Sequence, residues 1–215
     1  MKNIARFISF IFHPMLLTTY AVLLIFVLPT FLSLYPYNYK KAVVLIIFTA
    51  TFISPLLVML ILLNLRKIKS LHLVDRKERI FPFVISLVLY ISAYIITLRF
   101  PGGTPFFISS FVLLTTVLMF VLLLITFKFK VSVHMASIGG FIGWFYIFFL
   151  RLNLPEVLYV FNGFHFLTIY FFAGLFIVAG LIASSRLLLK AHNPIQIISG
   201  FFIGLTIGLF CGLLF

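Results

Sequence analysis

Two histidines stand beside basic or hydroxyl side chains where long apolar runs are interrupted. The stretch SSRLLLKAHNPIQ contains Arg186 and His192, and the stretch VSVH contains Ser132 and His134. Phosphoryl transfer needs a nucleophile, a general acid–base and fixed positive charge. Imidazole can fill the first two roles near neutral pH, and an arginine fork matches phosphate oxygens. The residue types favour this chemistry if the fold brings the histidines together, whereas either histidine alone is more typical of a ring hydrogen-bonded at a membrane interface.

A third stretch, RKIKSLHLVDRKERIFPF, supplies further cations. Its Lys69, Arg76, Lys77 and Arg79 are candidate phosphate ligands. Pro82 predicts the start of the next helix, because the first helical position needs no N–H. Such a cation-rich loop is also typical of a segment that orients a membrane protein, so both interpretations stay open.

Acidic residues are scarce. The chain has three, Asp75, Glu78 and Glu156, and we expect all of them in loops. Protein sites for Mg²⁺ are built on carboxylates. The sequence therefore predicts no metal and no other cofactor, and a phosphoryl transfer that proceeds without one.

The composition is that of an integral membrane protein. Of 215 residues, 64% are hydrophobic and only 9% are charged, and the mean hydropathy is +1.31. A soluble domain of this size cannot bury so much apolar surface. The net charge of +13 would suggest nucleic acid in a soluble protein. Here most cations fall in short loops between apolar runs, so we expect membrane lipids as partners and no nucleic acid.

The apolar runs predict an all-α, polytopic transmembrane helical bundle of six to seven spans, in a single domain over residues 1–215. Each run is close to the roughly 20 residues that a spanning helix needs. The shortest run is the fifth, which makes it the best candidate for an interfacial or re-entrant segment. The predicted spans are 7–34, 42–64, 81–98, 106–127, 134–150, 164–185 and 194–215.

Cations are distributed unequally between the two ends of this predicted bundle. If all seven runs cross the membrane, twelve of the 16 Lys and Arg residues lie at the end that carries the N-terminus and both histidines. The positive-inside rule makes that end cytoplasmic.

The last span carries an unbroken ladder of glycines. His192 and Gln196 are spaced i, i+4, so they share one helix face. Small residues on a membrane helix allow a close contact with another helix, either within the chain or between copies, so a homo-oligomer stays open. The same face continues through Gly200, Gly204, Gly208 and Gly212.

The order of these stretches resembles the type 2 phosphatidic acid phosphatase family of membrane lipid phosphatases. The third signature of that family is Ser-Arg, five residues, His, three residues and Asp. Ser185, Arg186 and His192 match its spacing, and Gln196 stands where the family has Asp.

The other two signatures match less closely. Ser132 and His134 fit Pro-Ser-Gly-His, with valines in place of the proline and the glycine. Lys69, six residues and Arg76 fit the beginning of Lys, six residues, Arg-Pro, with Lys77 in place of the proline. The resemblance covers residues from about 69 to 200.

The resemblance implies a role for each position. His192 would be the nucleophile that forms a phosphohistidine, and His134 would protonate the leaving group and then activate water. Gln196 would orient His192 as the family's Asp does, but without its charge. The residues that would bind the phosphate are Arg186, Lys69, Arg76, Lys77, Arg79 and Ser132.

The resemblance also implies a substrate and a place. The substrate would be a phosphorylated lipid, such as a polyprenyl diphosphate, phosphatidylglycerophosphate or phosphatidic acid. We expect a multi-pass protein of the bacterial inner membrane that acts as a lipid phosphatase.

Two other functions remain open. Gln196 favours a catalytically inactive relative that binds anionic lipid or a partner. A lipid transporter is the other alternative, although proton-coupled carriers usually bury carboxylates within the membrane.

Overall fold

The computed structural model describes residues 1–68, 76–100 and 103–214, with only the backbone of Arg76 and Lys77. Within these residues, six helical segments are long and apolar enough to cross a membrane, or seven if the bent pair at the N-terminus is one span. The chain is therefore an all-α polytopic helical bundle, as the composition predicts.

In the described residues, the elements are helices and one small hairpin. The helices are α1 (Lys2–Ile11), α2 (Pro14–Val27), α3 (Tyr37–Phe48), α4 (Ser54–Asn64), α5 (Arg76–Leu98), α6 (Phe106–Thr126), α7 (Val133–Arg151), α8 (Thr168–Leu188) and α9 (Pro194–Leu213). A 3₁₀ turn, η1 (Phe31–Leu34), precedes α3, and a π-helical turn, η2 (Thr49–Ile53), joins α3 to α4 in one span. The strands β1 (Val157–Phe161) and β2 (Phe164–Leu167) pair as an antiparallel hairpin.

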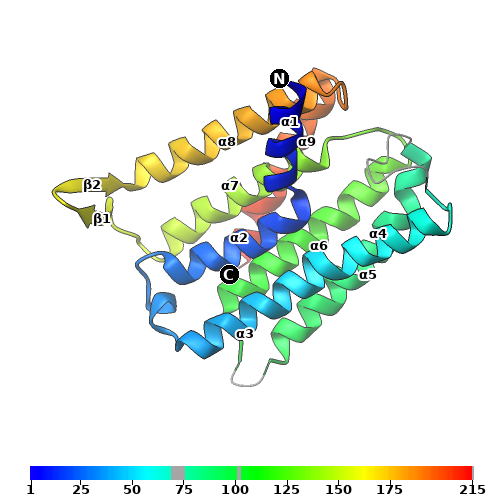
Figure 1. Cartoon of the computed structure of the whole chain (residues 1–215). Coiled ribbons are helices and arrows are strands. Elements are labelled where there is room, and N and C mark those ends of the chain that lie inside the picture. The colour runs from blue at the N-terminus through cyan, green and yellow to red at the C-terminus, as the bar shows by residue number, and fades with distance from the viewer. Residues whose placement is uncertain (69–75, 101–102, 215) are drawn as a thin grey trace.

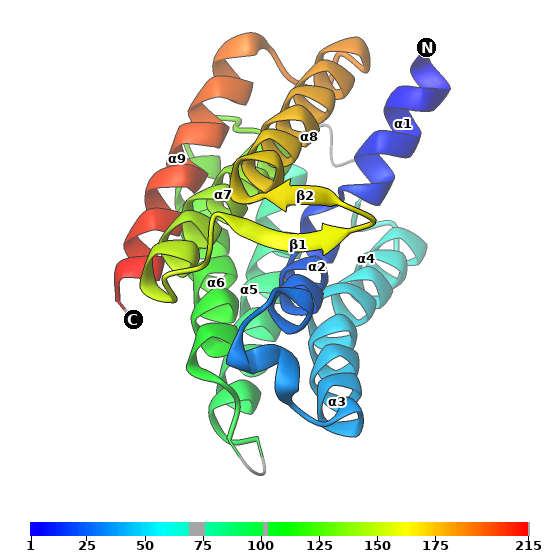
Figure 2. The same cartoon turned by 90° about the vertical axis from the view of Figure 1, so that its left-hand side faces the viewer.

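The two ends of the bundle differ in what they carry. The hairpin lies at one end, and the N-terminus and the turn between α8 and α9 lie at the other (Figure 1). Figure 2 shows α8 and α9 on one side of the bundle and α3 and α4 on the other.

The first predicted span, 7–34, is not one continuous helix, because it is broken before Pro14 and α2 ends at Val27. The axes of α1 and α2 are bent by 53°. Pro14 causes the break, because it lacks an N–H and its ring would clash with the carbonyl of the residue four before it. His13 then caps α2, and its Nδ1 accepts a hydrogen bond from the N–H of Met15 at 3.4 Å.

The fifth predicted span, now α7, is long and apolar enough to cross a membrane. Its 19 residues form one continuous helix with the length and apolarity of a membrane span. In the most apolar 18-residue stretch of this helix, 72% of the residues are buried. At 1.5 Å per residue the helix is about 28 Å long, close to the hydrocarbon thickness of a bilayer. Trp144, Phe145 and Phe148 are fully buried, so α7 is the centre of the core.

The predicted glycine contact is present and joins α9 to α7. A Cβ on Gly204 would collide with the carbonyl oxygen of Ala136, and one on Gly208 would collide with that of Gly140. Gly200 faces the carbonyl oxygen of Ser132 in the same way, at 2.7 Å from an added Cβ. The helix backbones therefore touch without side chains between them, as small residues at membrane helix contacts allow.

The substitution Gly204→Ala tests this contact. The added methyl group cannot fit against Ala136, so the helices must separate, and overpacking of this kind costs about 1–3 kcal/mol. We expect the midpoint of thermal unfolding in detergent to fall. Gly174→Ala in α8 is the matched control, because no atom lies within 4 Å of its added Cβ. Equal midpoints for the two variants would contradict the contact.

Candidate functional site

The N-terminal end of the bundle gathers segments that are far apart in the sequence. Two of the motif stretches meet directly, because the N–H of Ser132 donates to the carbonyl oxygen of Gln196 at 3.1 Å. This bond holds the start of α7 against the first turn of α9. The segments at this end are the break between α1 and α2, the starts of α5, α7 and α9, and the last turn of α8.

His192 lies in the turn just before α9, and its ring is buried. Its Nδ1 is 2.9 Å from Oε1 of Gln196. An amide oxygen can only accept, so Nδ1 carries the proton and Nε2 keeps its lone pair. The side chain of Gln196 therefore fixes the imidazole tautomer of His192.

The side chain of Gln196 is itself held in place. Asn193 caps α9, and its Oδ1 accepts from the N–H of Gln196 at 2.9 Å. In return, Oε1 of Gln196 accepts from the N–H of Asn193 at 3.4 Å, which completes a capping box. The amide oxygen thus receives two donors, one from the backbone and one from His192.

The surroundings of His192 favour its neutral form. The pKa of this imidazole is lowered to about 4, chiefly by burial and also by the positive charges of Arg79, Arg186 and Lys130, while the hydrogen bond to Gln196 raises it. Near neutral pH the ring is therefore uncharged, and its Nε2 is free of a proton. This is the state that a nucleophile requires.

His134 is the second residue of α7, at the predicted helix start. Its Nε2 is 3.1 Å from the carbonyl oxygen of Ser9 in α1. A carbonyl oxygen only accepts, so in the neutral ring Nε2 donates and Nδ1 holds the lone pair. Ser132 is fully buried and caps α7 by accepting from the N–H of Met135 at 3.5 Å. The predicted phosphate ligand Ser132 therefore also fixes the helix start that carries His134.

The positive charge of Arg186 acts on all three histidines of the site. It lies in the last turn of α8, and it interacts electrostatically with His13, His134 and His192. Its Nε is buried and has no hydrogen-bond partner among the residues that the structure describes. A buried cationic donor without a partner costs free energy, and an anion in this position would remove that cost.

Arg79 is the second guanidinium of the site and is buried. It lies in the first turn of α5, and its Nη1 donates to the carbonyl oxygen of Val131 at 3.5 Å. Arg79 and Arg186 also interact with each other. Two positive charges therefore lie together around His192, as a site for a multiply charged anion requires.

The other predicted residues of the basic loop are only partly placed. Lys69 lies outside the described residues, as do the side chains of Arg76 and Lys77. The prediction of Pro82 at the helix start is wrong, because α5 already begins at Arg76. Glu78 lies in the first turn of α5, so the prediction of a loop position for this acid is also wrong.

His13 is a site residue that the sequence analysis missed. Its ring centroid lies 5.4 Å from that of His134, and the two planes are at 83°. The available signal was an ionisable side chain inside an apolar run, which in membrane proteins marks a functional position. Within the described residues, His13, His134 and His192 do not form a group that could hold a metal ion.

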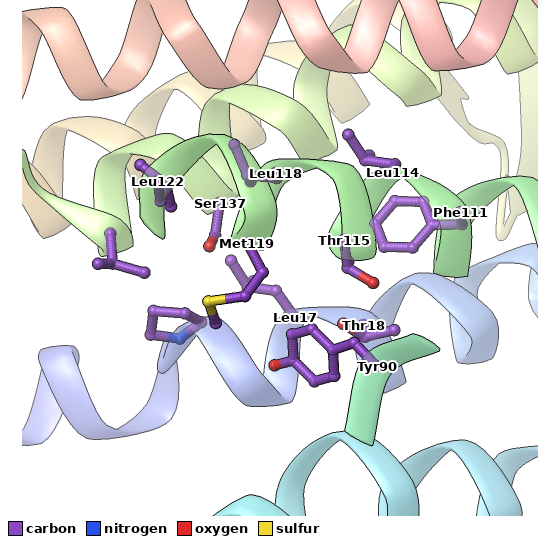
Figure 3. A pocket seen from close by; sticks show the side chains of 12 residues that line it. Leu17, Thr18, Tyr90, Phe111, Leu114, Thr115, Leu118, Met119, Leu122 and Ser137 are labelled. Carbon is purple, nitrogen blue, oxygen red and sulfur yellow. The ribbon is translucent and has the colours of Figure 1, made fainter. Parts of the chain in front are cut away.

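The lining of a small pocket includes Pro14 and Val133, the sequence neighbours of His13 and His134. Figure 3 shows Ser137 and other side chains around it, most of them apolar. Its volume of about 30 Å³ has room for a water molecule but not for a lipid chain.

A larger and more open cleft lies between α8 and α9. Its volume is about 300 Å³, and it is lined by apolar side chains and one glycine. Ala183 belongs to this lining and lies one helical turn before Arg186, and Ile197 follows Gln196 directly. An apolar chain in this cleft would have its polar end at the buried cations.

No protein-family model, curated protein or solved structure matches this chain.

Substitutions of Gln196 should move the titration of His192 in opposite directions. Gln196→Glu places a carboxylate where the amide oxygen is, so the pKa of His192 should rise above about 4. Gln196→Met removes the acceptor, so the pKa should fall. Titration of ¹³C-labelled histidine by NMR in detergent measures both shifts. If neither variant shifts the pKa of His192, the hydrogen bond between His192 and Gln196 is not formed.

Proposed function

We propose that this protein is a metal-independent lipid phosphatase that resembles the type 2 phosphatidic acid phosphatases. The observation that carries the proposal is the buried Nε of Arg186, which has no partner among the described residues and lies amid three imidazoles. A phosphate group would satisfy this donor and offset the charge of Arg79. A neutral imidazole with a free lone pair, His192, is in the same cluster.

The reaction would proceed in two steps. The lone pair on Nε2 of His192 attacks the phosphorus, the bond to the leaving oxygen breaks, and its electron pair leaves with that oxygen. Water then attacks the phosphohistidine, a proton passes to His134, and the electron pair of the P–N bond returns to Nε2. Throughout, Gln196 accepts the hydrogen bond from Nδ1 of His192, and Arg79 and Arg186 hold the phosphoryl oxygens.

A lipid is the substrate that fits the position of the site. The cluster lies at one end of a membrane bundle, and the apolar cleft between α8 and α9 begins one helical turn from Arg186. A polyprenyl diphosphate, phosphatidylglycerophosphate or phosphatidic acid would place its tail in or beside this cleft. Such lipids belong to the bacterial inner membrane, which we propose as the location.

One observation favours a second candidate, an inactive relative that binds anionic lipid. Gln196 positions His192 but has no charge to stabilise the positively charged phosphohistidine ring. Loss of the corresponding carboxylate in a catalytic triad costs about four orders of magnitude in rate. The binding cluster would remain intact in such a protein.

Phosphate release from the three lipids separates these candidates. We expect the purified protein in nanodiscs to release phosphate in the presence of EDTA. His192→Ala should remove the activity, since Nε2 of His192 is the proposed nucleophile. His134→Ala should lower it by about 10²–10⁴-fold, the usual contribution of a general acid–base.

Two control variants remove the same types of side chain, an imidazole and a cation, at positions outside the site. His165→Ala removes an exposed imidazole on the hairpin, and Arg66→Gln removes an exposed cation. Both should keep full activity. Activity that survives both His192→Ala and His134→Ala would exclude the mechanism, and lipid binding without any turnover would leave the inactive relative as the function.

A further inference from the structure

The break in the first span places a third imidazole at the site. The ring of His13 meets that of His134 edge-on, and Arg186 acts on both. Arg186 and His192 both act on His134, and Arg79 and Lys130 act on His192. A leaving group that departs as His192 attacks would then lie beside His13 and His134.

Hydrogen bonding sets what each of these two imidazoles can offer. Nδ1 of His13 accepts from the N–H of Met15, so in the neutral ring Nε2 carries the proton. That N–H has no hydrogen-bond partner within the described part of the chain. Nε2 of His134 is used by the carbonyl of Ser9, which leaves Nδ1 as a lone-pair acceptor. The pair therefore supplies one free donor, on His13, and one free base, on His134.

This pairing fits one class of leaving group. An alkoxide from a lipid monophosphate is strongly basic and needs a proton, which the neutral ring of His134 cannot give at Nδ1. The leaving group of a lipid diphosphate is a phosphate monoester, whose second pKa is about 6, so it departs as an anion. An anion needs a hydrogen-bond donor and no proton, and His13 has that donor.

We propose that the site is specific for lipid diphosphates and that His13 determines this specificity by donating from Nε2 to the leaving phosphate. The terminal phosphorus forms a bond to Nε2 of His192, the bridging P–O bond breaks, and its electron pair stays on the lipid monophosphate. Water then attacks the phosphorus and gives a proton to Nδ1 of His134, while the P–N bond breaks and its electron pair returns to Nε2 of His192. This inference rests on the proposed phosphatase function.

The substitution His13→Asn isolates the donor. Asparagine is a good N-cap, so its side-chain oxygen can still accept from the N–H of Met15 and preserve the start of α2. The Nε2–H is lost, whereas His13→Ala would remove the cap as well. His165→Asn on the exposed hairpin is the matched control for the same change of residue type.

The experiment compares geranylgeranyl diphosphate with geranylgeranyl monophosphate, which share one tail. For the wild-type protein in nanodiscs we expect kcat/KM to be higher with the diphosphate by about tenfold or more, as one hydrogen bond to a charged group allows. His13→Asn should reduce kcat with the diphosphate by a similar factor and leave the monophosphate almost unchanged. A purely structural role would lower both activities together.

Each outcome decides between the two proposals. Equal wild-type kcat/KM for both lipids, or an equal loss with both in His13→Asn, would overturn the specificity and leave the phosphatase function standing. Absence of turnover with every lipid would overturn both. A diphosphate preference that His13→Asn abolishes, with His165→Asn unchanged, would establish the inference.

Discussion

The contact between the backbones of α7 and α9 is the constraint on which the site depends. Gly204 and Gly208 bring the two helices so close that nothing larger than hydrogen fits between them at these points. The same contact ends at Ser132, whose N–H bonds to the carbonyl of Gln196. A shift of α9 by one turn, about 5.4 Å, would break that bond and separate His192 from the start of α7. The position of His192 is therefore set by packing in the core of the bundle.

Local spacing was enough to predict part of this arrangement. His192 and Gln196 at i, i+4 and the glycine ladder that follows are features of one helix, so the sequence showed their common face and their close contact. The break at His13 depended on a single proline within a long apolar run, and hydropathy alone does not register it. The central position of α7 in the bundle could not be predicted either, because lipid-facing and buried positions are equally apolar in a membrane protein. The hairpin at 157–167 is too short to show the alternation of a strand.

Long-range contacts account for the rest of the site. Ser9 bonds to His134 across 125 residues, and His13 meets the same ring. Both lie where α1 bends away from α2, so one proline brings a backbone acceptor and a third imidazole to the site together. No spacing rule connects these positions to the VSVH stretch, and only the folded chain does so.

The neutral side chain of Gln196 affects the charge of the cluster as well as the hydrogen bonding of His192. The positive charges of Arg79 and Arg186 act on His192. The hydrogen-bond partner of His192, Gln196, has no negative charge to offset them. An aspartate there would stabilise a phosphohistidine, but it would also repel an incoming phosphate. The neutral amide keeps the tautomer of His192 and does not reduce the positive potential of the guanidiniums.

Such a site gains most from a ligand with high negative charge, and a diphosphate carries more charge than a monophosphate. The charge around Gln196 and the hydrogen-bond roles of His13 and His134 thus favour the same substrate class for independent physical reasons.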